Sequence, residues 1–161
     1  MSAAAKPELV DLAEIRRQLK SGHKLQYLYV ALLGLRVYEP LKIYSRVRAG
    51  LAFSALERFQ RNTSLGSSEL STLVQLPPRT LARRKAAGRL EPEESDRLLR
   101  ASRVFGSALQ LFEGDAEAAR EWLLDKQPLL GGLVPLELAT TDVGALEVER
   151  LIGRLEHGIP A

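Results

Sequence analysis

The chain has 161 residues, of which 45% are hydrophobic and 27% charged, a composition typical of a globular protein of one or two small domains. It contains no cysteine, which excludes disulfides and thiolate chemistry, and no apolar run approaches the roughly 18 residues that span a membrane. Residues 1–5 lack the basic and apolar pattern of a secretory signal. We therefore expect a cytoplasmic protein with no membrane partner.

The net charge of +3 conceals an uneven distribution of charge along the chain. Residues 1–90 carry 16 Lys and Arg against 6 Asp and Glu, whereas residues 91–161 carry 7 against 14. Segregated charge of this kind predicts two tasks, in which the basic part meets a polyanion and the acidic part meets a different partner. Charges that vary by chance on solvated helix faces are the alternative explanation at this point.

The first fifty residues predict short helices separated by breakers. Apolar residues recur at helical spacing over residues 9–19, and Gly22 ends that stretch. Residues 25–33 are so uniformly apolar that a strand and a buried helix both fit them. A further short helix is predicted over residues 41–49, which lie between a proline and a glycine.

The middle of the chain predicts three closely spaced helices, over residues 54–62, 67–74 and 80–87. Two consecutive prolines, Pro77 and Pro78, break the chain between the second and third helix, and Gly88 ends the third. Two helices joined by a tight break are the layout of a helix-turn-helix.

The remainder of the chain is predicted to be helical as well. A long amphipathic helix follows Pro92, and its apolar stripe from Leu98 to Phe112 is wide enough for both a core and a dimer partner. A shorter helix follows Asp115, residues 127–135 are expected to form an irregular loop, and Thr141 or Asp142 opens the last helix. The predicted fold class is therefore all-α, with a helix-turn-helix part followed by a small helical domain.

The third helix of the middle region is strongly basic, because residues 79–89 hold five cations and no acid. At about 100° per residue, Thr80, Arg83 and Arg84 fall on one face, where arginine can bond guanine and threonine a base edge or thymine methyl. The other cations lie off this face and suit phosphates. A solvated face is the alternative, but the missing acids argue against balancing ion pairs. The predicted DNA-binding residues are Arg79, Thr80, Arg83, Arg84, Lys85 and Arg89.

Ordered motifs over residues 50–158 resemble those of the Xre/MbcA/ParS antitoxins, whereas residues 1 to about 45 lie outside the shared pattern. Lys126-Gln127-Pro128-Leu129 departs from the family, which has an asparagine near this proline. The motifs include Arg79-Thr80-Leu81-Ala82-Arg83-Arg84-Lys85, Gly88-Arg89-Leu90, Ala118-Ala119-Arg120-Glu121-Trp122-Leu123, Leu130-Gly131-Gly132 and Leu155-Glu156-His157-Gly158.

The resemblance implies a partner and an organisation. Family members pair with RES-domain toxins, which attack NAD or transfer its ADP-ribosyl group; the antitoxin covers the toxin's active-site entrance, represses the shared operon by binding operator DNA, and forms a homodimer. On this basis we expect a dimerising helical extension over residues 1–50, a helix-turn-helix domain over 51–92 and a toxin-binding domain over 93–161.

The acidic balance of the C-terminal part suits a toxin whose pocket must be cationic to hold the pyrophosphate of NAD. The chain's terminal carboxylate could enter such a pocket. A lone tryptophan is more often a core residue than an interface anchor, and ordinary core packing is an alternative role for the last helix. The predicted toxin-binding residues are Trp122, Arg150, Arg154, Glu156, His157 and Gly158.

Catalytic machinery is not apparent in the sequence. The two histidines, His23 and His157, are far apart, and no His/Glu pair has the spacing of metal ligands. Glu93 and Glu94 stand in the first turn of a predicted helix, where acids favour the helix dipole. We expect no enzyme activity, cofactor or metal. A helix-turn-helix regulator without a toxin, and an adaptor that uses acidic helices against another protein, remain as alternative functions.

Overall fold

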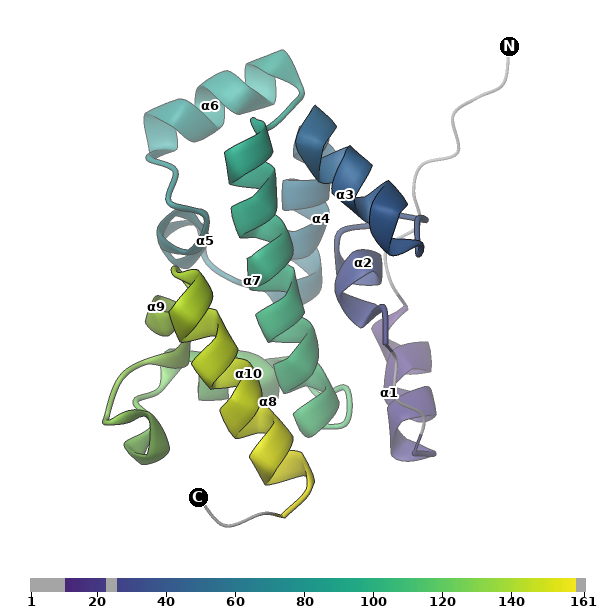
Figure 1. The fold of residues 1–161 in the computed structure, drawn as a ribbon, viewed down its shortest axis with the longest axis vertical. Helices are drawn as coiled ribbons and strands as arrows, with labels where there is room; N and C mark the ends of the chain where they lie inside the picture. The colour runs from purple at the N-terminus through teal and green to yellow at the C-terminus, as the bar shows by residue number, and fades with distance from the viewer. Residues whose placement is uncertain (1–10, 23–25, 159–161) are drawn as a thin grey trace.

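The computed structural model describes residues 11–22 and 26–158, and the elements within these ranges are helices (Figure 1). The predicted all-α fold is confirmed. The described part of the helix predicted over residues 9–19 is α1, while residues 9 and 10 of that prediction lie outside the described residues. The helices are α1 (Leu12–Lys20), α2 (Leu28–Leu32), α3 (Pro40–Ala49), α4 (Phe53–Thr63), α5 (Ser67–Val74), α6 (Pro78–Ala87), α7 (Pro92–Leu111), α8 (Ala116–Leu124), the 3-10 helix η1 (Pro128–Leu130), α9 (Pro135–Leu138) and α10 (Asp142–Glu156).

The 20-residue helix α7 organises the fold, because α2, α3, α5, α8 and α10 all pack against it. Figure 1 shows α7 through the middle of the molecule, with α6 across its N-terminal end and α10 running along its other half. Leu98, Phe105 and Leu109 are at most 1% exposed, and the Phe105 ring meets that of Phe59 edge to face at 6.2 Å. The expectation that this stripe also serves a partner is therefore wrong, since the core covers it.

Local signals set the ends of several helices as the sequence predicted. Thr141 is the N-cap of α10, where its hydroxyl accepts the main-chain N–H of Gly144 at 3.0 Å. Asp115 caps α8 in the same way through Ala118, at 3.1 Å. Gly88 ends α6 in the left-handed conformation, with φ of 76°.

Two segments differ from expectation. Residues 127–135 contain η1 and a bridge in which Gln127 N–H donates to the Leu133 carbonyl at 3.0 Å, so this loop is more regular than its prolines and glycines predicted. Within the ambiguous apolar segment, residues Leu28–Leu32 form the helix α2, in which Leu28, Val30 and Leu32 are buried. None of the described helices is both long and apolar enough to cross a membrane.

Candidate nucleic-acid and protein-binding sites

The helix-turn-helix is formed by α5 and α6. Three residues connect the two helices, and the first of them, Gln75, is left-handed with φ of 56°. Leu76 is 5% exposed and anchors the turn in the core, and Pro78 starts α6 at a position where the missing N–H costs nothing. No residue of α6 is buried, so the helix presents most of its surface to solvent at one end of the molecule (Figure 1).

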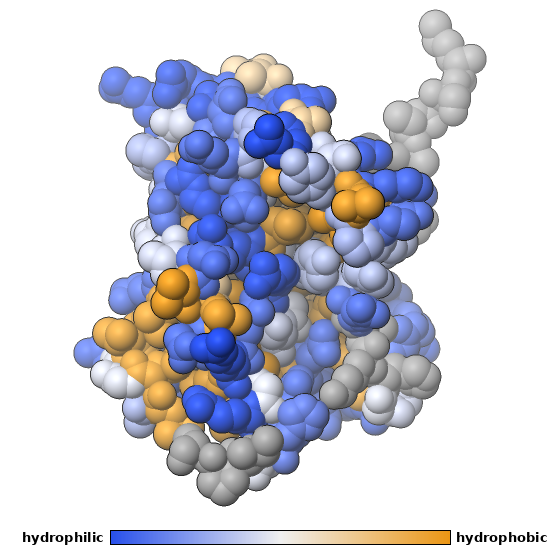
Figure 2. Space-filling view, in the orientation of Figure 1, coloured by the Kyte–Doolittle hydropathy of each residue, from blue (hydrophilic) through white to orange (hydrophobic). Residues whose placement is uncertain are grey.

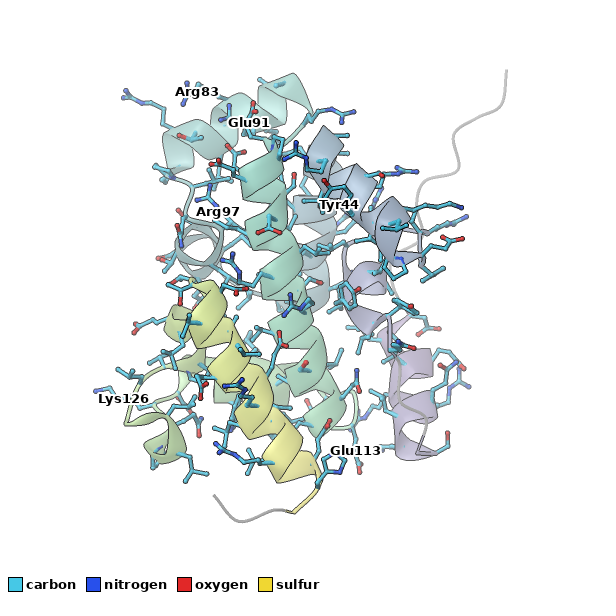
Figure 3. All side chains as sticks on the ribbon, in the orientation of Figure 1. Tyr44, Arg83, Glu91, Arg97, Glu113 and Lys126 are labelled. Atoms are coloured by element: carbon cyan, nitrogen blue, oxygen red, sulfur yellow. The ribbon has the colours of Figure 1, made fainter. Side chains whose placement is uncertain are left out.

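Three of the predicted DNA-binding cations on this helix are exposed and could contact a ligand. Arg79, Arg83 and Lys85 are exposed, and none of them forms an ion pair with any residue that the structure describes. Arg83 projects outward in Figure 3, and its side chain donates to the Thr80 hydroxyl at 3.4 Å. The predicted face of Thr80 and Arg83 is thus free to meet another molecule.

Arg84 has a different role from the one its helical position predicted. Its Nε donates to both carboxylate oxygens of Glu94, at 2.8 and 2.9 Å, and its Nη2 lies 2.8 Å from Oε1. Glu94 is the N3 residue of α7 and also accepts the main-chain N–H of Glu91 at 3.0 Å. The side chains are only 23% and 6% exposed, so this pair fastens α6 to α7. The expectation of no acid near Arg84 is wrong.

Arg89 also has a structural role, since its Nη1 donates to the carbonyl oxygens of Ala49 and Gly50 at 3.1 and 2.8 Å.

For Glu94, burial alone would raise the pKa of the carboxyl group. The hydrogen bonds from Arg84 and the Glu91 main chain outweigh burial, and the pKa lies below its ordinary value.

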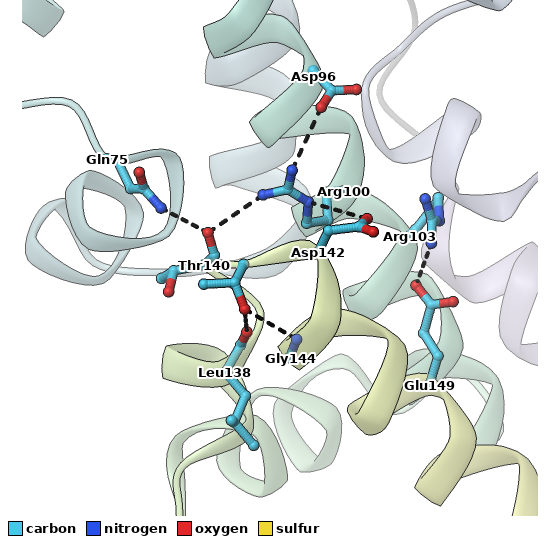
Figure 4. Close-up of polar contacts among 10 residues, drawn as sticks. Gln75, Asp96, Arg100, Arg103, Leu138, Thr140, Asp142, Gly144 and Glu149 are labelled. Carbon is cyan, nitrogen blue, oxygen red and sulfur yellow. Dashed lines mark hydrogen bonds and ion pairs between the residues drawn. The ribbon is translucent and has the colours of Figure 1, made fainter.

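Polar contacts join the helix-turn-helix to the start of α10 (Figure 4). The side-chain amide of Gln75 donates to the Thr140 carbonyl at 2.6 Å, and Arg100 Nη1 donates to the same oxygen at 3.3 Å. Arg100 also lies 3.5 Å from Asp96 and 4.0 Å from Asp142. The turn between α5 and α6 is therefore linked directly to the turn that precedes α10.

The predicted toxin-binding residues of α10 lie along its outer side and end. Arg150 is exposed and pairs with Glu147 at 2.8 Å, whereas Arg154 has a buried Nε without a hydrogen-bond partner in the described chain. Glu156, His157 and Gly158 are exposed at the end of the helix. The terminal carboxylate proposed for the toxin pocket lies outside the described residues.

Trp122 lies on α8, apart from these residues. It is partly buried, packs against the core, and its ring centroid lies 6.4 Å from that of Phe112. This environment is that of a core residue.

An apolar patch that the sequence did not predict is formed by Leu129, Leu133, Val143 and Leu146, which are 52%, 52%, 74% and 42% exposed. Figure 2 shows the corresponding hydrophobic surface over η1, α9 and the first turns of α10. In α10 the side chains of Val143 and Leu146 are exposed, whereas the buried residues are Gly144, Ala145, Val148, Leu151 and Ile152. Grouped exposed apolar residues mark interaction surfaces.

The helix-turn-helix carries an exposed basic helix, α6, and its α5 shares one hydrophobic core with α7, α8, α9 and α10. This arrangement defines a DNA-binding protein with an additional helical domain. Residues 42–103 match the family model of the antitoxin Xre-like helix-turn-helix domain. Residues 107–158 match that of the antitoxin Xre/MbcA/ParS C-terminal toxin-binding domain. The chain therefore belongs to the Xre/MbcA/ParS antitoxin family.

Relatives with established names agree with this assignment. Antitoxin Xre of Yersinia enterocolitica is 35% identical over 128 residues, which are 79% of this chain and 86% of the relative. Antitoxin Xre of Pseudomonas putida is 30% identical over 160 residues, which are 98% of each chain. Residues 1–41 lie outside both family models, in line with the expectation for the first 45 or so residues. A Prs ADP-ribosylating antitoxin of Sphingobium is 28% identical over 121 residues, 70% of this chain and 76% of the relative.

Proposed function

We propose that this antitoxin represses its own operon through α6 and neutralises a RES-domain toxin through its C-terminal domain, in the cytoplasm and without enzyme activity of its own. The observation that carries the proposal is the state of α6, which has no buried residue and bears Arg79, Arg83 and Lys85, exposed and without ion-pair partners in the described chain. Unneutralised cations on a helix fit duplex DNA, because phosphate contacts release condensed counterions.

Within α6 the cations have distinct tasks. Arg83 and Thr80 face outward together and suit base edges in the major groove, whereas Arg79 and Lys85 suit phosphates. Arg84 and Arg89 support this surface indirectly, because their bonds to Glu94 and to the end of α3 hold α6 in place.

For the toxin, two features of the C-terminal domain support a contact surface. The apolar patch lies wholly within residues 107–158, the range of the toxin-binding family model. The exposed residues Glu156, His157 and Gly158 at the end of α10 are the second feature. We propose that the patch docks the toxin while the end of α10, with Arg150, Arg154, Glu156, His157 and Gly158, covers its active-site entrance. Trp122 then stabilises the domain from within.

The name of the Sphingobium relative, a Prs ADP-ribosylating antitoxin, supports ADP-ribosyl chemistry on the side of the partner.

A homodimer is proposed to form through the N-terminal part. Leu41 and Tyr44 of α3 are 80% and 61% exposed, and the apolar stripe of α7 is buried. Two-fold symmetry would match a palindromic operator.

The test is co-expression with the RES-type protein encoded by the adjacent gene, with growth and cellular NAD as readouts, together with a gel-shift titration on the chain's own promoter. We expect rescue of growth, preserved NAD and promoter binding below micromolar concentration. Promoter binding without rescue would favour a regulator that has no toxin partner. Protein binding without any DNA binding would favour an adaptor.

A further inference from the structure

Two arginines in the last turn of α3, Arg46 and Arg48, are exposed and form no ion pair with a described residue. Between them, Val47 is buried and points into the core. Because successive residues of an α-helix are about 100° apart, the two arginine side chains project on either side of the buried one. The sequence pattern indicated no function for this helix.

The end of α3 is held firmly against the segment that follows α6. Arg89 Nη1 binds the carbonyls of Ala49 and Gly50, and Leu90 N–H donates to the Leu51 carbonyl at 2.9 Å. Gly50 has φ of 84°, and a Cβ there would lie 2.3 Å from the Leu90 carbonyl oxygen. In Figure 1 the C-terminal end of α3 accordingly lies beside the connection between α6 and α7, at the same end of the molecule as α6.

Arg48 in particular faces the start of α7. It lines a cleft of about 720 Å³ whose wall includes Pro92 and Glu93, the first residues of that helix. No ion pair joins Arg48 to Glu93 or to any other described carboxylate, so its charge is available to a ligand.

We propose that Arg46 and Arg48 bind phosphates of the DNA duplex beside the groove that α6 enters. The inference rests on the proposed DNA-binding function and adds α3 as a second DNA-binding element. A helix in the major groove lies between two phosphate backbones, and cations beside the reading helix position the protein without reading sequence. Because Arg89 ties α3 to α6, phosphate binding by α3 fixes the register of α6 in the groove.

The test compares the wild-type chain with Arg46→Ala/Arg48→Ala by fluorescence anisotropy, on the chain's own promoter fragment and on a scrambled duplex, between 50 and 200 mM salt. We expect the slope of log affinity against log salt to become shallower by about 0.9 for each phosphate that the variant no longer binds, on both duplexes alike. Arg46→Lys/Arg48→Lys keeps the charges and should keep the slope. The matched control Lys20→Ala/Lys126→Ala removes the same charge from two exposed sites, at the end of α1 (Figure 1) and after α8 (Figure 3), both away from α6, and should leave the slope unchanged.

An unchanged slope in the Arg46→Ala/Arg48→Ala variant would overturn the inference while leaving DNA binding by α6 intact. So would an effect confined to the promoter fragment, because phosphate binding strengthens the affinity for all sequences alike. Sedimentation of the Arg46→Ala/Arg48→Ala variant at the same concentrations must show the oligomeric state of the wild type. If the variant instead became a monomer, the weaker DNA binding would result from lost oligomerisation, and direct phosphate binding would be overturned. A wild-type chain that binds neither duplex would overturn the proposed DNA-binding function as well.

Discussion

The side-chain amide of Gln75 donates to the main-chain carbonyl of Thr140 at 2.6 Å, which places the turn of the helix-turn-helix in direct contact with the residue two positions before α10. The two residues are 65 positions apart in the chain (Figure 4). A DNA-binding element and a toxin-binding domain therefore share a hydrogen bond.

Gln75→Ala should destabilise the chain by about 1 kcal/mol, because it removes this hydrogen bond while keeping a left-handed backbone that is unfavourable for a residue with a Cβ. Gln75→Gly removes the same bond but accepts φ of 56° without strain, so it should be the more stable variant of the two. Urea unfolding of both variants measures the difference. Equal destabilisation of the two would show that the backbone conformation is unimportant.

Glu94→Gln should lower the melting temperature by several degrees, since it leaves the partly buried Arg84 without a charged partner. Glu93→Gln, in the same first turn but exposed, is the matched control and should change little.

The effect of Glu94→Gln should also depend on pH. The folded-state pKa of Glu94 is lowered from 4.5, so the ionised carboxylate stabilises the fold at neutral pH. This contribution disappears as the pH falls below about 4.5 and through the folded-state pKa. The difference between wild type and variant should accordingly shrink on the acid side. A constant difference from pH 3 to pH 7 would show that the charge of Glu94 is not involved.

Arg83→Ala and Arg84→Ala change adjacent residues but should affect different properties, promoter affinity for Arg83→Ala and thermal stability for Arg84→Ala. Arg83 has no ion-pair partner in the described chain, so its removal should cost about 1–3 kcal/mol of promoter affinity at an unchanged melting temperature. Arg84 fastens α6 to Glu94, so its removal should lower the melting temperature first. Anisotropy and circular dichroism on the two single variants separate the effects. Comparable melting temperatures would argue against a structural role for Arg84.

Val143→Ser with Leu129→Ser should weaken toxin capture at least tenfold without reducing stability, because both side chains are exposed within the apolar patch. Pull-down of the co-expressed toxin and size-exclusion chromatography provide the readout. Wild-type capture by the patch variant would place the toxin on another surface.

Gly144→Ala and Gly153→Ala test the packing of α10. A Cβ at Gly144 would lie 1.9 Å from the Leu138 carbonyl oxygen, so α10 must shift, at a cost of about 1–3 kcal/mol. At Gly153 nothing lies within 4 Å among the described residues, and alanine should stabilise the helix by up to about 1 kcal/mol. Thermal unfolding of the two variants measures both effects. A Gly144→Ala variant as stable as the wild type would contradict the close approach of Gly144 to the Leu138 carbonyl.

Much of the helical framework could be predicted from the sequence, because the signals involved are local. The helix predicted over residues 67–74 has the bounds of α5 in the structure, and Thr141 and Gly88 predicted the ends of their helices. Capping and helical periodicity depend on residues within four positions of each other, so no knowledge of the fold is needed to read them.

The function of individual side chains was decided by tertiary structure. Periodicity placed Arg84 on the same outer face as Arg83, but Glu94, ten residues away on another helix, captures one arginine and leaves the other free. Likewise Val143 is apolar and adjacent to buried residues in the sequence, yet the close approach of Gly144 to Leu138 turns it outward. An isolated helix has no inside or outside, and only the helices packed against it determine which charges are neutralised and which apolar residues stay exposed.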